Sequence, residues 1–306
     1  MAAADSLASD RPSLRSGSTS QGLLLTLIGD YWFGQPMYIP SAALVALLKE
    51  FDISDQAARA ALSRVQRAGY LVGERDGRRT MYRLSPESAN RAVTSGRRIM
   101  RFTAETADAV AGWTGRWTIV TYALQTDQVD ERREIRRRLR RLGFGPLQDA
   151  VWISPRVTAA QLRKGFDDDH ADAVTVFEHA RLAETDELDV ARVWDLDELA
   201  ARYESIIAQM RDILPLVRAR REPSPEVALK ARTEAMQEWR KMPVIDPRLP
   251  ADLLPGDWPG WEARRLFAEV YDALGPLAAQ RVRDVIEPHS EVAAAAVHFD
   301  AVAAPR

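Results

Sequence analysis

The sequence has 306 residues and contains no cysteine, which excludes disulfide bonds, thiolate metal sites and cysteine nucleophiles. Histidine is also scarce. The four histidines are not spaced as metal ligands would be, for example as an i, i+4 pair on one helix; they are His170, His179, His289 and His298. We therefore predict neither a metal nor a cofactor. The lack of cysteine is compatible with a reducing cytoplasm.

Long apolar segments are missing as well. The apolar run GLLLTLIG over residues 22–29 is ended by Asp30, whereas a membrane-spanning helix needs about 18 or more apolar residues. The pattern of a secretion signal, a basic segment followed by a small-residue cleavage site, does not occur. We expect a cytoplasmic protein with no membrane partner and a disordered leader over residues 1–17.

The formal net charge is only −2, but the charge is unevenly distributed. Residues 51–101 contain eleven arginines and five acidic residues, which corresponds to a formal charge of +6. Such a local excess indicates a polyanionic partner for this segment. A solvated basic surface is the alternative, and charge alone does not decide between the two.

The segment over residues 18–100 shows the pattern of a winged helix-turn-helix. Helical spacing of apolar residues predicts helices within 19–33 and 40–51, the second with Ser41 as N-cap. A third helix follows over 54–69, with Ser54 as N-cap and Gly69 just beyond its end. Two strands, YLVGER and TMYRL, are joined by an Asp-Gly turn. Three helices followed by a two-stranded hairpin are typical of this motif.

The third helix has two different sides. At about 100° per residue, the small apolar residues Ala58, Ala61, Leu62 and Val65 share one side. The opposite side carries Gln, Ser and Arg, which can read base edges or bind phosphates. We predict DNA contacts by this helix and by the basic tip of the hairpin; the candidate residues are Ser54, Gln56, Arg59, Ser63, Arg64, Arg67, Arg75, Arg78 and Arg79. A winged helix that contacts only proteins is the alternative.

Residues 115–195 predict a ferredoxin-like domain. The pattern of strand, helix, two strands, helix and strand is the βαββαβ order of that fold. Its first helix, DERREIRRRLRRLGF over 130–144, has seven arginines within ten residues, but Ile135, Leu139 and Leu142 give it an apolar stripe. We expect a helix packed on the sheet with an arginine-rich solvent face; contact with nucleic acid is the alternative. The run Asp167–Asp169 is read as a solvated turn rather than a metal site.

Residues 196–290 predict a helical domain, and the complete fold is therefore of the α+β class. We expect a helix that breaks near Pro215, a helix capped by Ser224 and an amphipathic helix over 261–274, followed by a flexible tail over 291–306. The segment contains no nucleophile–base pair and no phosphate loop. Trp239, Trp258 and Trp261 either line an effector pocket or pack in the core.

Several segments in this order resemble a known family; they are LLLTLIGDYW, ISDQAARAALSRVQRAGYL, GRRTMYRLSPES, GRWTIVTYAL, RRLGFGPLQDAVWISPR and EWRKMPVIDPRLPADLLPGDWPGWEARRLF. Together they cover roughly residues 20–280 and resemble the PaaX family of bacterial transcriptional regulators, which repress phenylacetate catabolism. The resemblance implies a winged-helix domain, a central ferredoxin-like domain similar to CRISPR adaptation nucleases, and a helical C-terminal domain. It also implies a homodimer on palindromic operator DNA that is released by an acyl-coenzyme A effector such as phenylacetyl-coenzyme A.

The sequence differs from those nucleases at one position that matters for catalysis. They hold a metal-binding aspartate after a tyrosine at the end of the first strand of the domain, whereas Tyr122 is followed here by Ala123. We therefore predict a regulator without enzymatic activity, and a metal-dependent nuclease or a protein-only scaffold as the competing functions. No motif identifies the effector, its pocket or the operator.

Overall fold

The computed structural model describes residues 20–106, 112–124, 128–166, 173–183, 189–218 and 223–302. The predicted leader lies outside these residues. The described residues form two compact units: the first lies within residues 1–104, 208–240 and 265–306, and the second within residues 105–207 and 241–264. Within the described residues, no helix is long and apolar enough to cross a membrane. The three-domain division of the sequence stays a prediction, and each unit is described by itself.

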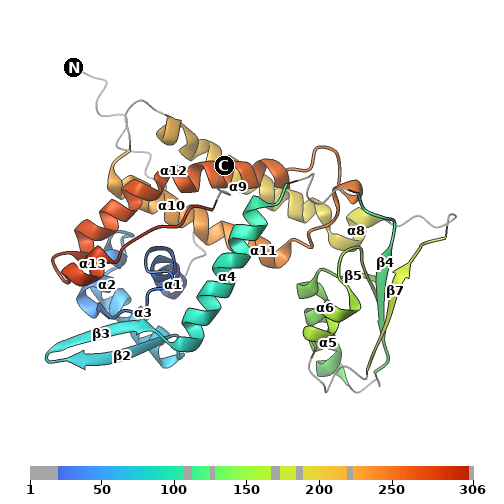
Figure 1. Ribbon diagram of the computed structural model, residues 1–306, viewed down its shortest axis with the longest axis horizontal. Helices are drawn as coiled ribbons and strands as arrows, with labels where there is room; N and C mark the ends of the chain where they lie inside the picture. Colours follow the sequence, from blue (N-terminus) through green and yellow to red (C-terminus); the bar gives the residue numbers. More distant parts are fainter. Residues whose placement is uncertain are drawn as a thin grey trace. The chain divides into compact units, whose positions relative to one another are not determined.

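The first unit contains the winged helix-turn-helix (Figure 1). Its elements are α1 (Ser20–Tyr31), β1 (Ile39–Pro40), α2 (Ser41–Lys49), α3 (Asp55–Arg67), β2 (Leu71–Asp76), β3 (Arg79–Leu84) and α4 (Pro86–Ala104). The strands form an antiparallel sheet in the order β1-β3-β2, in which Gly73 of β2 pairs with Tyr82 of β3. The predicted winged helix is confirmed in element order and topology.

Two local details differ from the sequence prediction. Ser41 is the first helical residue of α2 rather than its N-cap; Pro40 occupies the cap position, and no side chain caps the helix there. Helix α4, which continues directly from the wing, was not predicted from the sequence. Its buried residues are Ser88, Phe102 and Thr103, and of these only Phe102 is a large apolar residue.

The remaining elements of the first unit come from the C-terminal half of the chain, and α10 packs against α1. They are the end of α9 (Leu196–Arg218) from residue 208 on, α10 (Pro225–Trp239), most of α12 (Gly260–Ile286), α13 (Glu291–Ala295), and the segment that follows α13. The indole of Trp32, directly after α1, donates to the carbonyl oxygen of Ala293 at 3.0 Å. The segment expected to be a flexible tail instead packs up to residue 302, because Val297 and Val302 are buried and the Val302 amide donates to Asp272.

A buried arginine lies where α1, α10 and α12 meet. Arg232 of α10 is fully buried; its guanidinium lies 3.7 Å from the centre of the Tyr271 ring, and its Nε donates to the Tyr271 carbonyl oxygen at 3.2 Å. Its Nη1 is 3.9 Å from Asp30 Oδ2. Burial raises the pKa of Asp30 to about 6, although the charge of Arg232 acts in the opposite direction. A desolvated ion pair therefore connects the winged helix to the C-terminal helices.

The second unit contains a ferredoxin-like domain. Its elements are β4 (Trp117–Tyr122), α5 (Val129–Leu142), β5 (Gly145–Gln148), β6 (Val151–Ser154), α6 (Ala159–Lys164) and β7 (Val174–Ala180). The four strands form an antiparallel sheet in the order β5-β6-β4-β7. This order and the βαββαβ sequence of elements confirm the prediction. The run Asp167–Asp169 lies outside the described residues.

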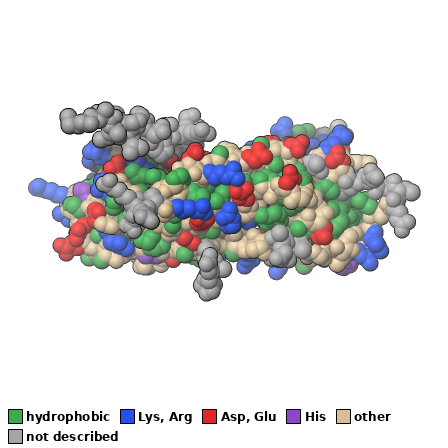
Figure 2. All heavy atoms as spheres, turned by 90° about the horizontal axis from the view of Figure 1, so that it is seen from above, with side chains coloured by type: hydrophobic (Ala, Val, Ile, Leu, Met, Phe, Trp, Pro, Cys, Tyr) green, Lys and Arg blue, Asp and Glu red, His purple; other side chains and the backbone are tan. Residues whose placement is uncertain are grey.

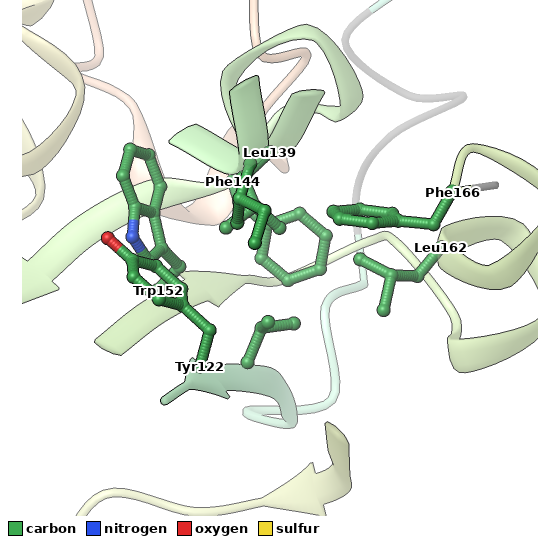
Figure 3. Packing of buried hydrophobic residues seen from close by; sticks show 8 residues of the cluster. Tyr122, Leu139, Phe144, Trp152, Leu162 and Phe166 are labelled. Carbon is green, nitrogen blue, oxygen red and sulfur yellow. The ribbon is translucent and has the colours of Figure 1, made fainter. Parts of the chain in front are cut away.

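One apolar core joins the sheet to α5 and α6 (Figure 3). Tyr122 and Trp152 extend from the strands toward Leu139 of α5 and Phe144, and Leu162 of α6 closes the cluster beside Phe166. Ile135 and Leu139 are completely buried. The apolar stripe of the arginine-rich helix is therefore the part that packs on the sheet, as the sequence predicts.

The other helical elements are α8 (Val190–Trp194), α9 (Leu196–Arg218), α11 (Met242–Ile245) and the short 3₁₀ helix η2 (Ala251–Leu253). The predicted break near Pro215 is wrong, because α9 continues through Pro215 to Arg218. A proline removes one helical hydrogen bond and strains the preceding turn. Here it lies in the last turn of a 23-residue helix, where few further hydrogen bonds depend on it.

Candidate nucleic-acid interface

Local signals define both ends of α3. The Ser54 side chain accepts a hydrogen bond from the amide of Ala57 at 3.3 Å, which satisfies one of the free amides of the first turn. Gly69 has a φ of 77°, a conformation that costs little only for glycine, and it turns the chain from the helix into β2. The Ser54 hydroxyl accepts this bond and keeps its own proton for donation.

The two sides of α3 are those that the sequence predicts. The buried residues of the helix are Ala58, Ala61, Leu62 and Val65. All six candidates at this helix are exposed; they are Ser54, Gln56, Arg59, Ser63, Arg64 and Arg67. Arg67 Nε donates to the Ser63 carbonyl oxygen at 3.5 Å. The small buried side brings α3 close to α1 and α2, and the polar side remains accessible.

The wing brings three more candidates to the solvent. Gly77, with a φ of 57°, forms the tight turn between β2 and β3. Arg75, Arg78 and Arg79 around this turn are all exposed. Within the described residues, neither these arginines nor Arg59 and Arg64 of α3 make an ion pair. Unpaired guanidinium groups keep their full capacity to bind phosphate oxygens.

The arginines of α5 are engaged differently. Arg138 donates to Glu134 at 2.7 Å, and this hydrogen bond lowers the pKa of the glutamate. Arg137 also pairs with Glu134, and Arg133 lies 3.4 Å from Asp130. The Arg140 guanidinium lies 5.4 Å from the Trp152 ring. Most of this basic run is therefore occupied within its own domain.

Mixed charge is also visible elsewhere on the surface. The face in Figure 2 carries Lys and Arg side chains interspersed with Asp and Glu side chains. Elsewhere in the first unit, Arg281 pairs with Glu50 at 2.7 Å and Arg218 with Glu269. The arginines of α3 and the wing differ from these because, in the part of the chain that the structure describes, they have no acidic partner.

The end of β4 shows what stands at the position of the nuclease aspartate. Ala123 follows Tyr122, and its amide donates to the carbonyl oxygen of Ala173. The Tyr122 hydroxyl accepts from Arg136 Nε at 2.9 Å and donates to the Asp149 carbonyl oxygen. Within the described residues, no three His, Cys, Asp or Glu side chains converge as metal ligands would. This geometry favours a structural role for the strand end.

Of the three tryptophans considered for an effector pocket, Trp239 and Trp258 pack in the interior and Trp261 is partly buried. Trp239 is fully buried, stacks on Phe267 at 4.5 Å and donates its indole N–H to Thr103 Oγ1 at 2.8 Å. Trp258 is also buried and packs edge-on against Tyr203. Trp261 lies 4.9 Å from the Arg264 guanidinium. Their contacts support the core-packing interpretation.

Gln66 of α3 is exposed but was not among the predicted DNA contacts. It lies beside a hollow of about 360 Å³ between the end of α3 and the wing; the lining residues are Gln66, Gly73, Glu74, Arg75, Thr80 and Tyr82. The Tyr82 hydroxyl donates to Gln66 Oε1 at 3.4 Å. Residues 16 apart form this contact, so helical periodicity gives no signal for it.

The helix-turn-helix and its basic hairpin define a winged-helix protein, here joined to a ferredoxin-like domain. Comparison with protein families matches residues 19–88 to PaaX-like protein, residues 110–191 to the PaaX protein central Cas2-like domain, and residues 194–284 to the PaaX-like protein C-terminal domain. Most of the chain is thus covered in the order of that family. The chain belongs to the PaaX family.

Two individual proteins are similar over most of their length. The transcriptional repressor PaaX of Escherichia coli (strain K12) is 30% identical over 258 residues, which are 82% of this chain and 76% of that protein. The solved structure of an uncharacterized protein from Mycobacterium tuberculosis has a TM-score of 0.58 and 24% identity, and the match covers 88% of this chain and 98% of that one. The second likeness concerns the fold alone.

Proposed function

We propose that this protein is a DNA-binding transcriptional repressor without enzymatic activity. The observation that carries the proposal is the set of exposed, unpaired arginines on α3 and the wing. Similarity to the repressor of Escherichia coli supports the same function. Acting on chromosomal DNA, the protein would work in the bacterial cytoplasm.

The proposed interface places α3 in the major groove and the wing on the neighbouring backbone. Gln56, Arg59, Ser63 and Arg64 would face the base edges, where arginine pairs with guanine O6 and N7 and glutamine with adenine N6 and N7. Arg67 and the hydroxyl of Ser54 would bind phosphates. Arg75, Arg78 and Arg79 of the wing would bind phosphates or enter the minor groove.

The proposal extends to assembly and regulation. A homodimer would bind a palindromic operator, because two-fold symmetry in the protein matches two-fold symmetry in the DNA. An acyl-coenzyme A effector, such as phenylacetyl-coenzyme A, would release it by binding more tightly to an arrangement that cannot bind DNA. The regulated genes would serve aromatic or acyl-coenzyme A catabolism.

Duplex selection tests the DNA-binding proposal. Wild-type protein is incubated with a random-sequence duplex library, and the enriched sequence is measured by fluorescence anisotropy from 0.05 to 0.3 M salt. We expect a palindromic consensus and an affinity that falls steeply with salt, since each phosphate contact contributes a slope of about −0.9. No enrichment together with a flat salt dependence would contradict the proposal and favour a protein scaffold.

The effector proposal has its own test. Phenylacetyl-coenzyme A, phenylacetate and coenzyme A are titrated separately into the protein–duplex complex. Release by the thioester alone supports the proposal, whereas release by none of the three removes this effector class. Incubation of the same duplex with wild-type protein and magnesium or manganese tests the nuclease alternative. Cleavage of the duplex would support that alternative.

A further inference from the structure

The contact between α3 and the wing assigns a role to Gln66, which was not among the predicted DNA contacts. Gln66 is seven residues after Arg59, two helical turns further along the same flank of α3. Gln66 lines the hollow between α3 and the wing. Gln66 is exposed, whereas its partner Tyr82 is buried in β3.

Two neighbours hold the Gln66 amide in one place. The Tyr82 hydroxyl donates to Oε1 at 3.4 Å. On the other side, a Cβ atom added to Gly73 would lie 2.7 Å from Gln66 Nε2 and 3.3 Å from Cδ. The amide therefore lies against bare strand backbone, and the absence of a side chain at position 73 makes this possible. Gly73 is needed here for space rather than for its backbone conformation, since its φ is not positive.

The contacts of the Gln66 amide leave its N–H donors available. A glutamine amide has two N–H donors on Nε2 and an acceptor oxygen, and Tyr82 occupies the oxygen. In the described residues, no partner is present for the Nε2 donors. The hollow also contains one acidic and one basic side chain, Glu74 and Arg75. Because these charges offset each other, a directed neutral donor is the distinctive feature of the hollow.

We propose that Gln66, held by Tyr82 and Gly73, is a positioning residue that donates a hydrogen bond to a DNA phosphate oxygen between the recognition helix and the wing. The inference rests on the proposed DNA-binding function. With α3 in the major groove and the wing on the adjacent backbone, one phosphodiester strand passes between them. A contact of this kind fixes the register of the protein on the duplex but carries no base information.

A neutral donor has a signature that separates it from the arginines. It releases no counterion, so its loss weakens binding without changing the salt slope. Gln66→Ala should lower affinity for the selected duplex about three- to tenfold, the range for one net hydrogen bond. The loss should be equal for matched and mismatched duplexes. Gln148→Ala, an exposed glutamine on β5 of the other unit, is the matched control and should have no effect.

The variant Gly73→Ala tests whether the position of the Gln66 amide against β2 matters for DNA binding. The added methyl group would displace Gln66 Nε2, the flexible end of a side chain, so the protein should fold and lose affinity to the same extent. The added Cβ would also lie 3.2 Å from Tyr82 Cε1, and this contact remains in the Gln66→Ala background. A double variant that binds like Gln66→Ala shows that the loss in Gly73→Ala arises from the amide and not from the Tyr82 ring. Gly256→Ala, where an added Cβ meets nothing within 4 Å, is the control. Thermal unfolding of each variant checks the fold.

The outcomes separate the inference from the proposed function. Equal losses, an unchanged slope and no additivity support the role of Gln66. Unchanged affinity in Gln66→Ala, additive losses or a reduced slope would overturn it while wild-type binding still stands. Relaxed preference at one base pair would make Gln66 a base-reading residue instead. If wild-type protein selects no duplex, the proposed function itself fails.

Discussion

Two arginine-rich surfaces of this chain differ in what their guanidinium groups contact. On α5, Glu134 accepts from two arginines, Asp130 and Tyr122 hold two more, and Trp152 lies beside another. On α3 and the wing, the arginines are fewer but have no acidic partner in the described residues. We therefore expect unpaired charge, rather than the density of positive charge, to mark the nucleic-acid surface of this protein.

The physical reason is that a paired guanidinium must lose its partner before it binds phosphate. Exposed ion pairs stabilise a protein by only about 0–1 kcal/mol, but they hold donors in place and cancel the local field. Unpaired arginines raise the positive potential and attract DNA over several ångströms. The α5 run should therefore contribute mainly to its own domain.

The largest expected effect comes from removing the wing charge. The triple variant Arg75→Ala, Arg78→Ala, Arg79→Ala should reduce the salt slope by about 2.7, which corresponds to about 500-fold weaker binding at 0.1 M salt. The matched triple variant Arg133→Ala, Arg137→Ala, Arg140→Ala removes the same formal charge from α5 and should leave the slope unchanged. Anisotropy titrations across salt concentrations measure both. Equal changes of the salt slope in the two triple variants would show that the arginines of α5 contact DNA as much as those of the wing.

The next largest effect is a loss of stability on changing the apolar side of α5. Ile135 is completely buried against the sheet, so Ile135→Ala should lower the free energy of unfolding by about 2–5 kcal/mol. Urea unfolding monitored by circular dichroism measures the change. DNA affinity of the folded variant should remain that of wild-type protein. A specific loss of DNA binding at unchanged stability would place α5 in the interface after all.

A single arginine of α3 tests base recognition. If Arg64 reads a guanine, Arg64→Ala should cost about 1–3 kcal/mol of binding free energy and relax the preference at one base pair. Competition with a set of single-substitution duplexes provides the measurement. Uniform weakening across the set would show that Arg64 holds only a phosphate.

The last prediction concerns pH and Asp30, the buried partner of Arg232. Since burial raises the pKa of Asp30 from 3.8 to about 6, the folded protein keeps a proton that the unfolded chain has lost between these values. The contribution of Asp30 to the free energy of unfolding should fall as pH rises from about 4 to about 6 and stay constant above. Asp30→Asn should remove this part of the pH profile. Parallel profiles of the two proteins between pH 4 and 6 would show that Asp30 is not the responsible group.

Much of the fold was predictable because its signals are local. Ser54 and Gly69 mark the ends of α3, four small apolar residues mark its buried side, and Asp76-Gly77 marks the wing turn. The ferredoxin-like order follows from strand and helix periodicity. Local signals failed where packing compensates for them: α9 continues through Pro215, and the alanine-rich end packs through Val297 and Val302.

By itself, the sequence determined the order of elements in the winged helix and in the ferredoxin-like domain, the exposed side of α3 and the basic wing, because capping, turn and periodicity signals act within a few residues. Only the tertiary structure decided which charges are paired and which are buried. Arg232 lies against Tyr271, 39 residues away, and the Gln66 amide against Tyr82 and Gly73. Such contacts depend on how distant segments pack, and no local pattern encodes them.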